Sequence, residues 1–168
     1  MNTSTIYGLI AGLLSMGLLT VLYLNNPDNM LTGLEKFSWL LILLAMFIGV
    51  ARERGLRKEP FIEFSEALRS SFKIFIIAYL LKFVFIYILF NFADPSLLEK
   101  ARLAAVKIFT EHRNADITQE IFEQQLDAFG KGYFGPRIFD IGVMLELIVG
   151  FLLSLATAAI MKREKPDY

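Results

Sequence analysis

Long runs of apolar residues alternate with shorter polar segments along this chain of 168 residues. The first run, Ile6–Leu24, contains no charged side chain. At a helical rise of about 1.5 Å per residue it is long enough to cross the roughly 30 Å hydrocarbon core of a bilayer. Three further runs follow, and the whole pattern predicts an all-α integral membrane protein. Its four transmembrane helices are expected at about residues 6–24, 33–51, 74–92 and 138–161.

The first two runs each allow a second interpretation of their ends. The first could instead be a cleaved signal peptide, but no lysine or arginine precedes it, and its Leu22–Leu24 end does not resemble a small-residue cleavage site. We therefore expect a retained helix. The second run, Phe37–Ala51, is short for a span, so its helix is expected to begin near residue 33, with Glu35 and Lys36 reaching into the lipid head groups.

A helical period of apolar residues also marks the segment before the third span. In and just after residues 59–73, apolar residues recur at intervals of three or four, and charged residues occupy much of the other face. The apolar residues are Phe61, Phe64, Leu68, Phe72 and Phe75. The pattern predicts a cytoplasmic amphipathic helix that lies on the membrane surface. A straight extension of the third span would have the same period, so the two alternatives stay open.

Between the third and fourth spans, residues 93–137 predict a periplasmic helical insertion. Asp94-Pro95 is a good helix start, and Asp116 with Gln119 has the spacing of a capping box for a second helix. Each helix carries one apolar stripe, so the two form an amphipathic helical hairpin that needs cover from the other helices, from lipid or from another protein. The chain is thus expected to be a single membrane domain over residues 1–168.

Composition agrees with the membrane class. Apolar residues make up 55% of the chain and aromatic residues 14%, which is more than a soluble domain of this length needs. The formal net charge is zero and gives no support for a nucleic-acid partner. The chain has no cysteine, which excludes disulfides, thiolate metal sites and cysteine nucleophiles.

Lysine and arginine are concentrated at the ends of the second and fourth runs. Arg52, Arg54 and Arg57 follow the second run, and Lys162 and Arg163 follow the fourth. Short, positively charged segments stay on the cytoplasmic side of the inner membrane. We therefore expect a multi-pass protein of the bacterial inner membrane with both termini in the cytoplasm.

Two apparent signs of chemistry are better explained by structure. Gly130–Gly135 matches the glycine pattern of a dinucleotide-binding loop, but that loop follows a strand in a βαβ unit, whereas a linker between two helices is expected here. His112 is the only histidine, so it has no histidine partner for a metal site. We expect no catalytic residue, no cofactor and no metal ligand.

Small residues recur at helical spacing in the first and last runs. Gly8 and Gly12 have the spacing that lets two membrane helices approach closely. The last run has a longer stripe, which repeats every fourth residue: Gly142, Glu146, Gly150, Ser154 and Ala158. Such a stripe indicates a surface that packs on protein, so Glu146 is expected in a helix contact. An ionisable residue there is a candidate functional residue.

Lys82 is the second charged residue inside an apolar run. If the third and fourth spans are antiparallel, Lys82 approaches Glu146 with an offset of about six residues, on the order of 9 Å along the helix. The two side chains therefore form a candidate intramembrane polar site. In the alternative, Lys82 reaches toward the membrane surface while Glu146 is protonated or bound to water.

The arrangement resembles a known family, domain of unknown function 4199, whose members are small bacterial membrane proteins with four spans. The similar stretches are Tyr7–Gly12 (YGLIAG), Phe61–Leu68 (FIEFSEAL) and Met161–Pro166 (MKREKP), within a resemblance that covers nearly the whole chain. The resemblance implies an inner-membrane location. It supplies no activity and no functional residues.

Three functions from different classes agree with these patterns. The preferred hypothesis is a non-enzymatic accessory or structural subunit that engages membrane lipid and either a membrane-protein partner or a second copy of itself. The first alternative is a small oligomeric transporter or ion-coupled protein that uses Lys82 and Glu146. The second alternative is a lipid-modifying enzyme, or a helper of one, that acts on lipid-linked sugars.

Overall fold

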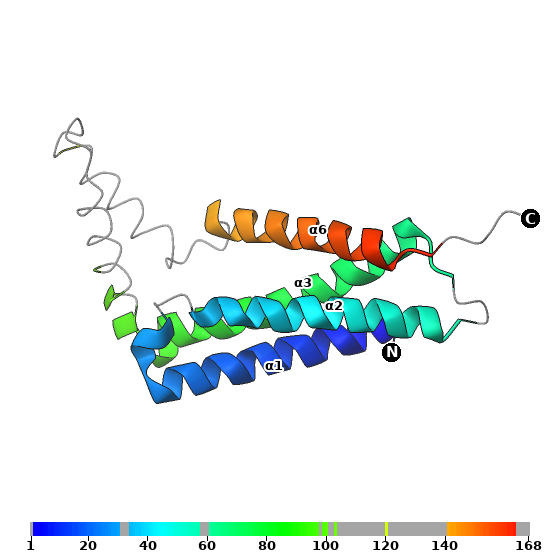
Figure 1. Ribbon diagram of the computed structural model, residues 1–168. Coiled ribbons are helices and arrows are strands. Elements are labelled where there is room, and N and C mark those ends of the chain that lie inside the picture. Colours follow the sequence, from blue (N-terminus) through cyan, green and yellow to red (C-terminus); the bar gives the residue numbers. More distant parts are fainter. Residues whose placement is uncertain are drawn as a thin grey trace, which may run out of the picture. The chain divides into compact units, whose positions relative to one another are not determined.

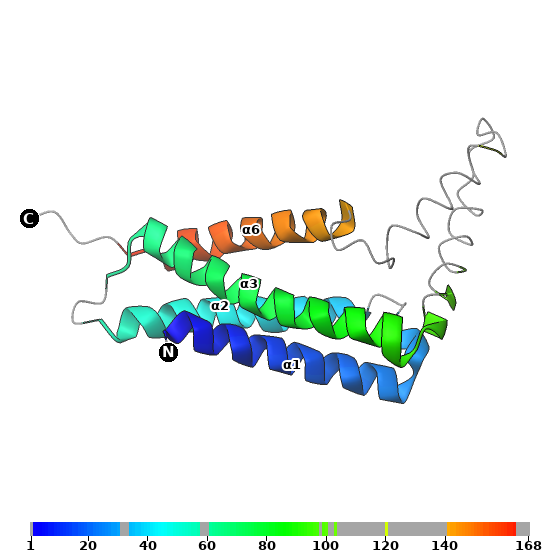
Figure 2. The same cartoon turned by 180° about the vertical axis from the view of Figure 1, so that it is seen from behind.

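A computed structural model of the protein describes residues 2–30, 34–57, 61–97, 99–100, 103, 120 and 141–163. Within these residues the chain forms four α-helices and no strand (Figures 1 and 2). The α-helices are α1 (Thr3–Asn25), α2 (Phe37–Gly55), α3 (Phe64–Ile88) and α6 (Ile141–Met161). Two short 3₁₀ turns, η1 (Pro27–Met30) and η2 (Leu34–Lys36), lie between α1 and α2, and a π-helical turn, η3 (Leu89–Ala93), continues α3.

The chain divides into two compact units. The first unit comprises Met1–Phe85 and Leu147–Tyr168, and the second comprises Ile86–Glu146. The first unit therefore holds α1, α2, most of α3 and most of α6. The predicted hairpin at residues 93–137 falls in the second unit, and nearly all of it lies outside the described residues.

Three helical segments among the described residues are long and apolar enough to cross a membrane: Thr3–Asn25, Phe64–Ala93 and Val143–Met161. The second predicted span, α2, begins at Phe37 and continues to Gly55, whereas the prediction was 33–51. Its last turn carries Arg52 and Arg54, which a helix C-terminus favours because positive charge complements the partial negative charge of its last carbonyl groups. These charges confine the uncharged part of α2 to Phe37–Ala51.

The segment before the third span is part of that helix. α3 runs without a break from Phe64 to Ile88, so residues 64–73 continue directly into the predicted third span. Phe75, the last residue of the predicted apolar stripe, is buried, but the first turns bury a different set of residues. Phe64 is 38% exposed, whereas Ala67, Ser70 and Ser71 are buried. Small residues occupy this face because neighbouring helices approach it closely.

α1 packs against α3 through Gly8 and Gly12. A Cβ atom added at Gly8 would lie 2.8 Å from Cβ of Ile77, and one added at Gly12 would lie 2.9 Å from Cβ of Leu81. Both distances are too short for real side chains, so the glycines allow a helix approach that alanine would not.

α6 packs against another side of α3. Gly150 faces the ring of Phe75, and a Cβ atom there would overlap that ring. One turn further along α6, the backbone oxygen of Ser154 accepts a hydrogen bond of 3.2 Å from the hydroxyl of Ser71. Gly150 and Ser154 are buried together with Ala158, so this part of the predicted stripe lies on the packed face of α6.

Aromatic rings fill the space between α3 and its neighbours. Phe75 stacks on Tyr79 one turn away with ring centres 5.5 Å apart, and Trp39 of α2 stacks on Phe75 at 5.8 Å. On the side of α6, Phe72 meets Phe151 edge to face at 5.5 Å. α3 therefore contacts each of the other three helices within the first unit.

We predict that Gly150→Ala destabilises the protein by about 1–3 kcal/mol, the usual cost of overpacking a filled interior. Thermal unfolding of the purified full chain in mild detergent measures the loss. Gly17→Ala is the matched control, because a Cβ atom at Gly17 meets nothing within 4 Å. Adding Phe75→Leu to Gly150→Ala should recover part of the stability, since the smaller side chain makes room. Equal losses for Gly150→Ala and Gly17→Ala would contradict the close approach of α6 to α3.

Candidate functional site

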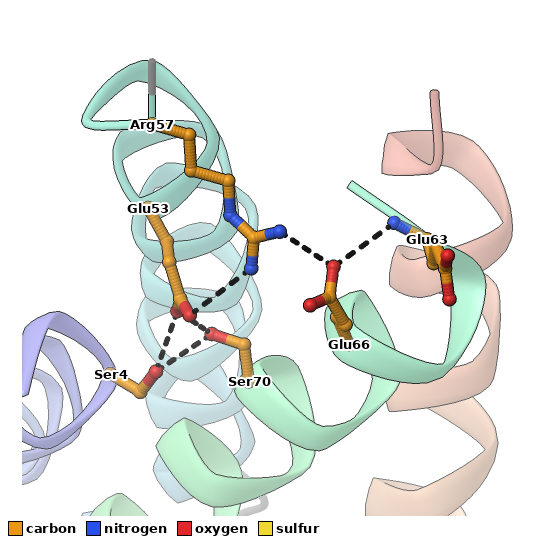
Figure 3. A network of polar contacts seen from close by, with 6 residues as sticks. All are labelled: Ser4, Glu53, Arg57, Glu63, Glu66 and Ser70. Carbon is orange, nitrogen blue, oxygen red and sulfur yellow. Dashed lines mark hydrogen bonds and ion pairs between the residues drawn. The ribbon is translucent and has the colours of Figure 1, made fainter. Parts of the chain in front are cut away.

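A cluster of polar side chains lies where the start of α1, the end of α2 and the start of α3 meet. Figure 3 shows Ser4 of α1, Glu53 of α2, Arg57 just beyond α2, and Glu66 and Ser70 of α3. These helix ends come together because the helices run alternately up and down within the first unit. We call this set of five residues the polar cluster.

The carboxylate of Glu53 holds two buried hydroxyl groups. Ser4 and Ser70 are 2% and 4% exposed, and their hydroxyl groups lie 2.7 Å apart. Ser4 donates a hydrogen bond of 2.9 Å to Oε2 of Glu53, and Ser70 donates to the same oxygen. Because a buried hydroxyl group without an acceptor is costly, the carboxylate satisfies both serines and joins three helices.

Arg57 links the end of α2 to the start of α3. Its Nη1 lies 2.6 Å from Oε2 of Glu66, and its Nη2 lies 4.0 Å from Oε1 of Glu53. The side chains of Arg57 and Glu66 are 32% and 44% exposed, so the ion pair contributes only about 0–1 kcal/mol. Its main effect is to neutralise charge and to orient the connection between the two helices.

Glu66 also caps the N-terminus of α3. Its Oε2 accepts a hydrogen bond of 3.4 Å from the backbone N–H of Glu63, the residue before the helix. This is the return bond of a capping box, in which the third helical residue satisfies the N–H group of the cap residue. A negative charge in the first turn is further favoured by the helix dipole.

A second set of contacts joins the end of α6 to the same region. Arg54 donates a hydrogen bond of 3.3 Å to the backbone oxygen of Met161. Ile62 and Arg163 exchange two backbone hydrogen bonds of 3.1 and 2.9 Å in an isolated antiparallel bridge. A cluster of buried apolar residues backs this bridge: Val50, Ile62, Ala67 and Ala158. The two basic segments that the sequence places far apart therefore lie at the same end of the first unit.

The polar cluster pairs opposite charges at the helix ends, but its hydroxyl groups are poorly placed for catalysis. A serine nucleophile must be reachable by substrate, and Ser4 and Ser70 are buried between helices. Among the described residues, no group of three or more His, Cys, Asp or Glu side chains could hold a metal ion. The chemistry that the described geometry supports is structural pairing of charges at the helix ends.

Sequence patterns did not predict the polar cluster. The basic residues around Glu53 dominate that segment of the sequence, and Ser4 and Ser70 belong to none of its patterns. One signal could have found them. An acid between Arg52 and Arg54 at the end of an apolar run is costly near lipid and needs partners.

Lys82 is buried in α3, with 3% of its surface exposed. Its Nζ lies 5.2 Å from the ring centre of Trp39, in the position of a cation–π interaction. Such a contact is worth about 2 kcal/mol or more when the cation is removed from water. Trp39 was not part of the predicted site.

Glu146, the other predicted polar residue, is exposed on α6. It belongs to the second compact unit, whereas Lys82 belongs to the first, so their pairing stays a prediction. Gly142 lies in the first turn of α6. The remaining members of the predicted packing set, in the first unit, contact α3 or lie buried on α6, as described above.

Long apolar helices with buried hydroxyl groups between them suggest a membrane protein, and three described segments have the required length and composition. The chain belongs to the family described as protein of unknown function (DUF4199), whose family model matches residues 6–163. No curated protein and no solved structure was found to match the chain.

We predict that Glu53→Ala destabilises the purified protein by about 1–3 kcal/mol, because Ser4 and Ser70 lose their acceptor while they remain buried. Glu53→Gln should cost less, since its amide oxygen can still accept. Glu63→Ala is the matched control, because Glu63 is exposed and enters the polar network through its backbone N–H. Thermal unfolding in detergent measures all three variants. If Glu53→Ala unfolds at the same temperature as Glu63→Ala, the carboxylate does not hold the helix ends together.

Proposed function

We propose that this protein is a multi-pass protein of the bacterial inner membrane in which all four α-helices cross the bilayer. Among the described residues, large apolar side chains are exposed along the helices, and small and hydroxyl-bearing residues occur among the buried ones. Exposed large apolar residues occur on every helix, for example Leu13, Leu44, Leu80 and Leu152. Lipid is the solvent that such a surface requires.

The exposed face of α2 supports the fourth crossing. It is apolar along most of the helix, with Phe37, Leu40, Leu44 and Ile48 all more than half exposed. A helix that met lipid only at its ends would not need such a face. The charges at its C-terminal end fit the membrane surface, where long basic side chains reach the head groups.

The orientation rests on the basic segments. Arg52 and Arg54 end α2, and Arg163 follows α6 at the same end of the first unit. We propose that this end and both termini lie in the cytoplasm, because positively charged segments are retained there.

Cysteine labelling tests the crossing of α2 and the orientation together. The chain has no cysteine, so single cysteines can be placed at Asn26, Leu56 and Asp167. Asn26 and Leu56 are exposed and flank α2 on its two sides. In spheroplasts, an impermeant thiol reagent should label the cysteine at position 26 and leave those at 56 and 167 unlabelled until the membrane is opened. Equal labelling at 26 and 56 would show that α2 does not cross, and the inverse pattern would reverse the orientation.

We further propose that the protein is a non-enzymatic accessory subunit that binds a membrane-protein partner or a second copy of itself. The observation that carries this proposal is the exposure of Glu146. The residue lies about 7.5 Å of helical rise from the start of α6. Its neighbours Met144, Leu145 and Ile148 are exposed apolar residues. A carboxylate on an apolar, lipid-facing surface is expensive, so a partner that covers it is favoured.

Photo-crosslinking tests the partner. A photoreactive phenylalanine replaces Leu145 beside Glu146, and in a second strain it replaces Leu44 on α2. The two leucines are matched, since each is 57% exposed. Illumination of intact cells should join position 145 to a protein of defined mass, whereas position 44 should react with lipid alone. Adding Glu146→Leu should reduce the crosslink at 145. The same product from both positions, or no protein product at 145, would contradict an interface at Glu146.

A further inference from the structure

The polar cluster lies at one end of the first unit. At this end, two of the acids lie close to an arginine, whereas several cations are exposed. The acids Glu53 and Glu66 both lie close to Arg57 and share its single positive charge. Arg52, Arg69, Lys73 and Arg163 are exposed. They come from α2, from α3 and from the segment after α6, and we call them the basic rim.

Each described helix that contributes to the basic rim continues into an exposed apolar face. Arg52 is one helical turn beyond Ile48 and two turns beyond Leu44, both of them exposed. On α3, Lys73 lies two turns before the exposed Leu80. Residues spaced by whole turns share a face of a helix, so these cations lie at the end of surfaces that we assign to lipid acyl chains.

Arg163 is held in place by its backbone. The two hydrogen bonds with Ile62 fix its backbone beside the start of α3, and its side chain is exposed there. Arg69 and Lys73 are one turn apart on α3 and form a pair. The rim has four cations against two exposed acids, Glu63 and Glu66, and Glu66 is paired with Arg57, so the rim presents net positive charge outward.

We propose that the basic rim binds the phosphate groups of anionic membrane lipids, whose acyl chains lie along the apolar faces of α2 and α3. The inference rests on the proposed membrane insertion and adds the class of ligand that this end recognises. Each arginine or lysine near a membrane surface attracts anionic head groups by an amount equivalent to roughly a fivefold preference. Long, flexible side chains at the ends of apolar helices reach such phosphates while their stems stay against the acyl chains.

The test uses the full chain reconstituted in phosphatidylcholine vesicles with spin-labelled lipid as the probe. The fraction of spin label whose motion is restricted by protein is measured for labelled phosphatidylglycerol and for labelled phosphatidylcholine. The wild-type protein should restrict phosphatidylglycerol several-fold more strongly at low salt, and less so as salt screens the charges. The variant Arg52→Gln/Arg69→Gln/Lys73→Gln/Arg163→Gln should lose that preference.

Two controls make the result specific. Lys36→Gln removes an exposed cation from the opposite end of α2 and should leave the preference unchanged. Arg52→Lys/Arg69→Lys/Arg163→Lys keeps the charges and should keep the preference. Inorganic phosphate should compete no better than chloride at equal ionic strength, and better competition would assign the rim to a free anion and overturn the lipid proposal.

The outcomes separate this inference from the proposed function. If neither labelled lipid is restricted, the protein does not span the bilayer and the proposed function fails. If both are restricted equally by the wild-type protein, or if the glutamine variant keeps the full preference, the membrane insertion stands and the lipid-binding rim is refuted.

Discussion

Close approach of neighbouring helices to α3 sets the other contacts of the first unit. Gly8 and Gly12 bring α1 against Ile77 and Leu81, and Gly150 brings α6 against the ring of Phe75. Apolar side chains gain little by leaving lipid for a protein interior, so membrane helices associate through tight packing and hydrogen bonds. The small residues supply that packing. The exposed faces of the same helices are free to carry large apolar residues.

Tight packing also explains why the polar groups lie where they do. Hydroxyl groups are small enough to fit between close helices, but burial makes each of them need an acceptor. The backbone oxygen of Ser154 accepts a hydrogen bond from Ser71. The carboxylate of Glu53 accepts hydrogen bonds from Ser4 and Ser70 at the helix ends. Glu53 in turn lies close to Arg57, which also pairs with Glu66. Arg57 therefore offsets part of the negative charge of these two acids, and the cations of the basic rim are exposed.

The two ionisable residues predicted inside the apolar runs have different surroundings. Lys82 is buried with its ammonium group over the indole ring of Trp39, and the electron-rich face of the ring offsets part of the cost of removing the charge from water. Glu146 is exposed on an apolar helix. An isolated carboxylate on an apolar helix face is costly in lipid, and this cost is the basis of the proposed partner contact.

The sequence by itself determined the helices, because apolar residues in long runs leave no other way to satisfy the backbone in lipid. It also determined that small residues at Gly8, Gly12 and Gly150 belong to one face of each helix, since helical spacing is a local property. Only the tertiary structure decided which face of α3 is buried and which side chains meet there. Ser4 and Glu53, which form a hydrogen bond, are 49 positions apart in the chain, and the contacting hydroxyl groups of Ser4 and Ser70 are 66 positions apart. Contacts between residues so far apart depend on how whole helices pack, and no local period in the sequence encodes that packing.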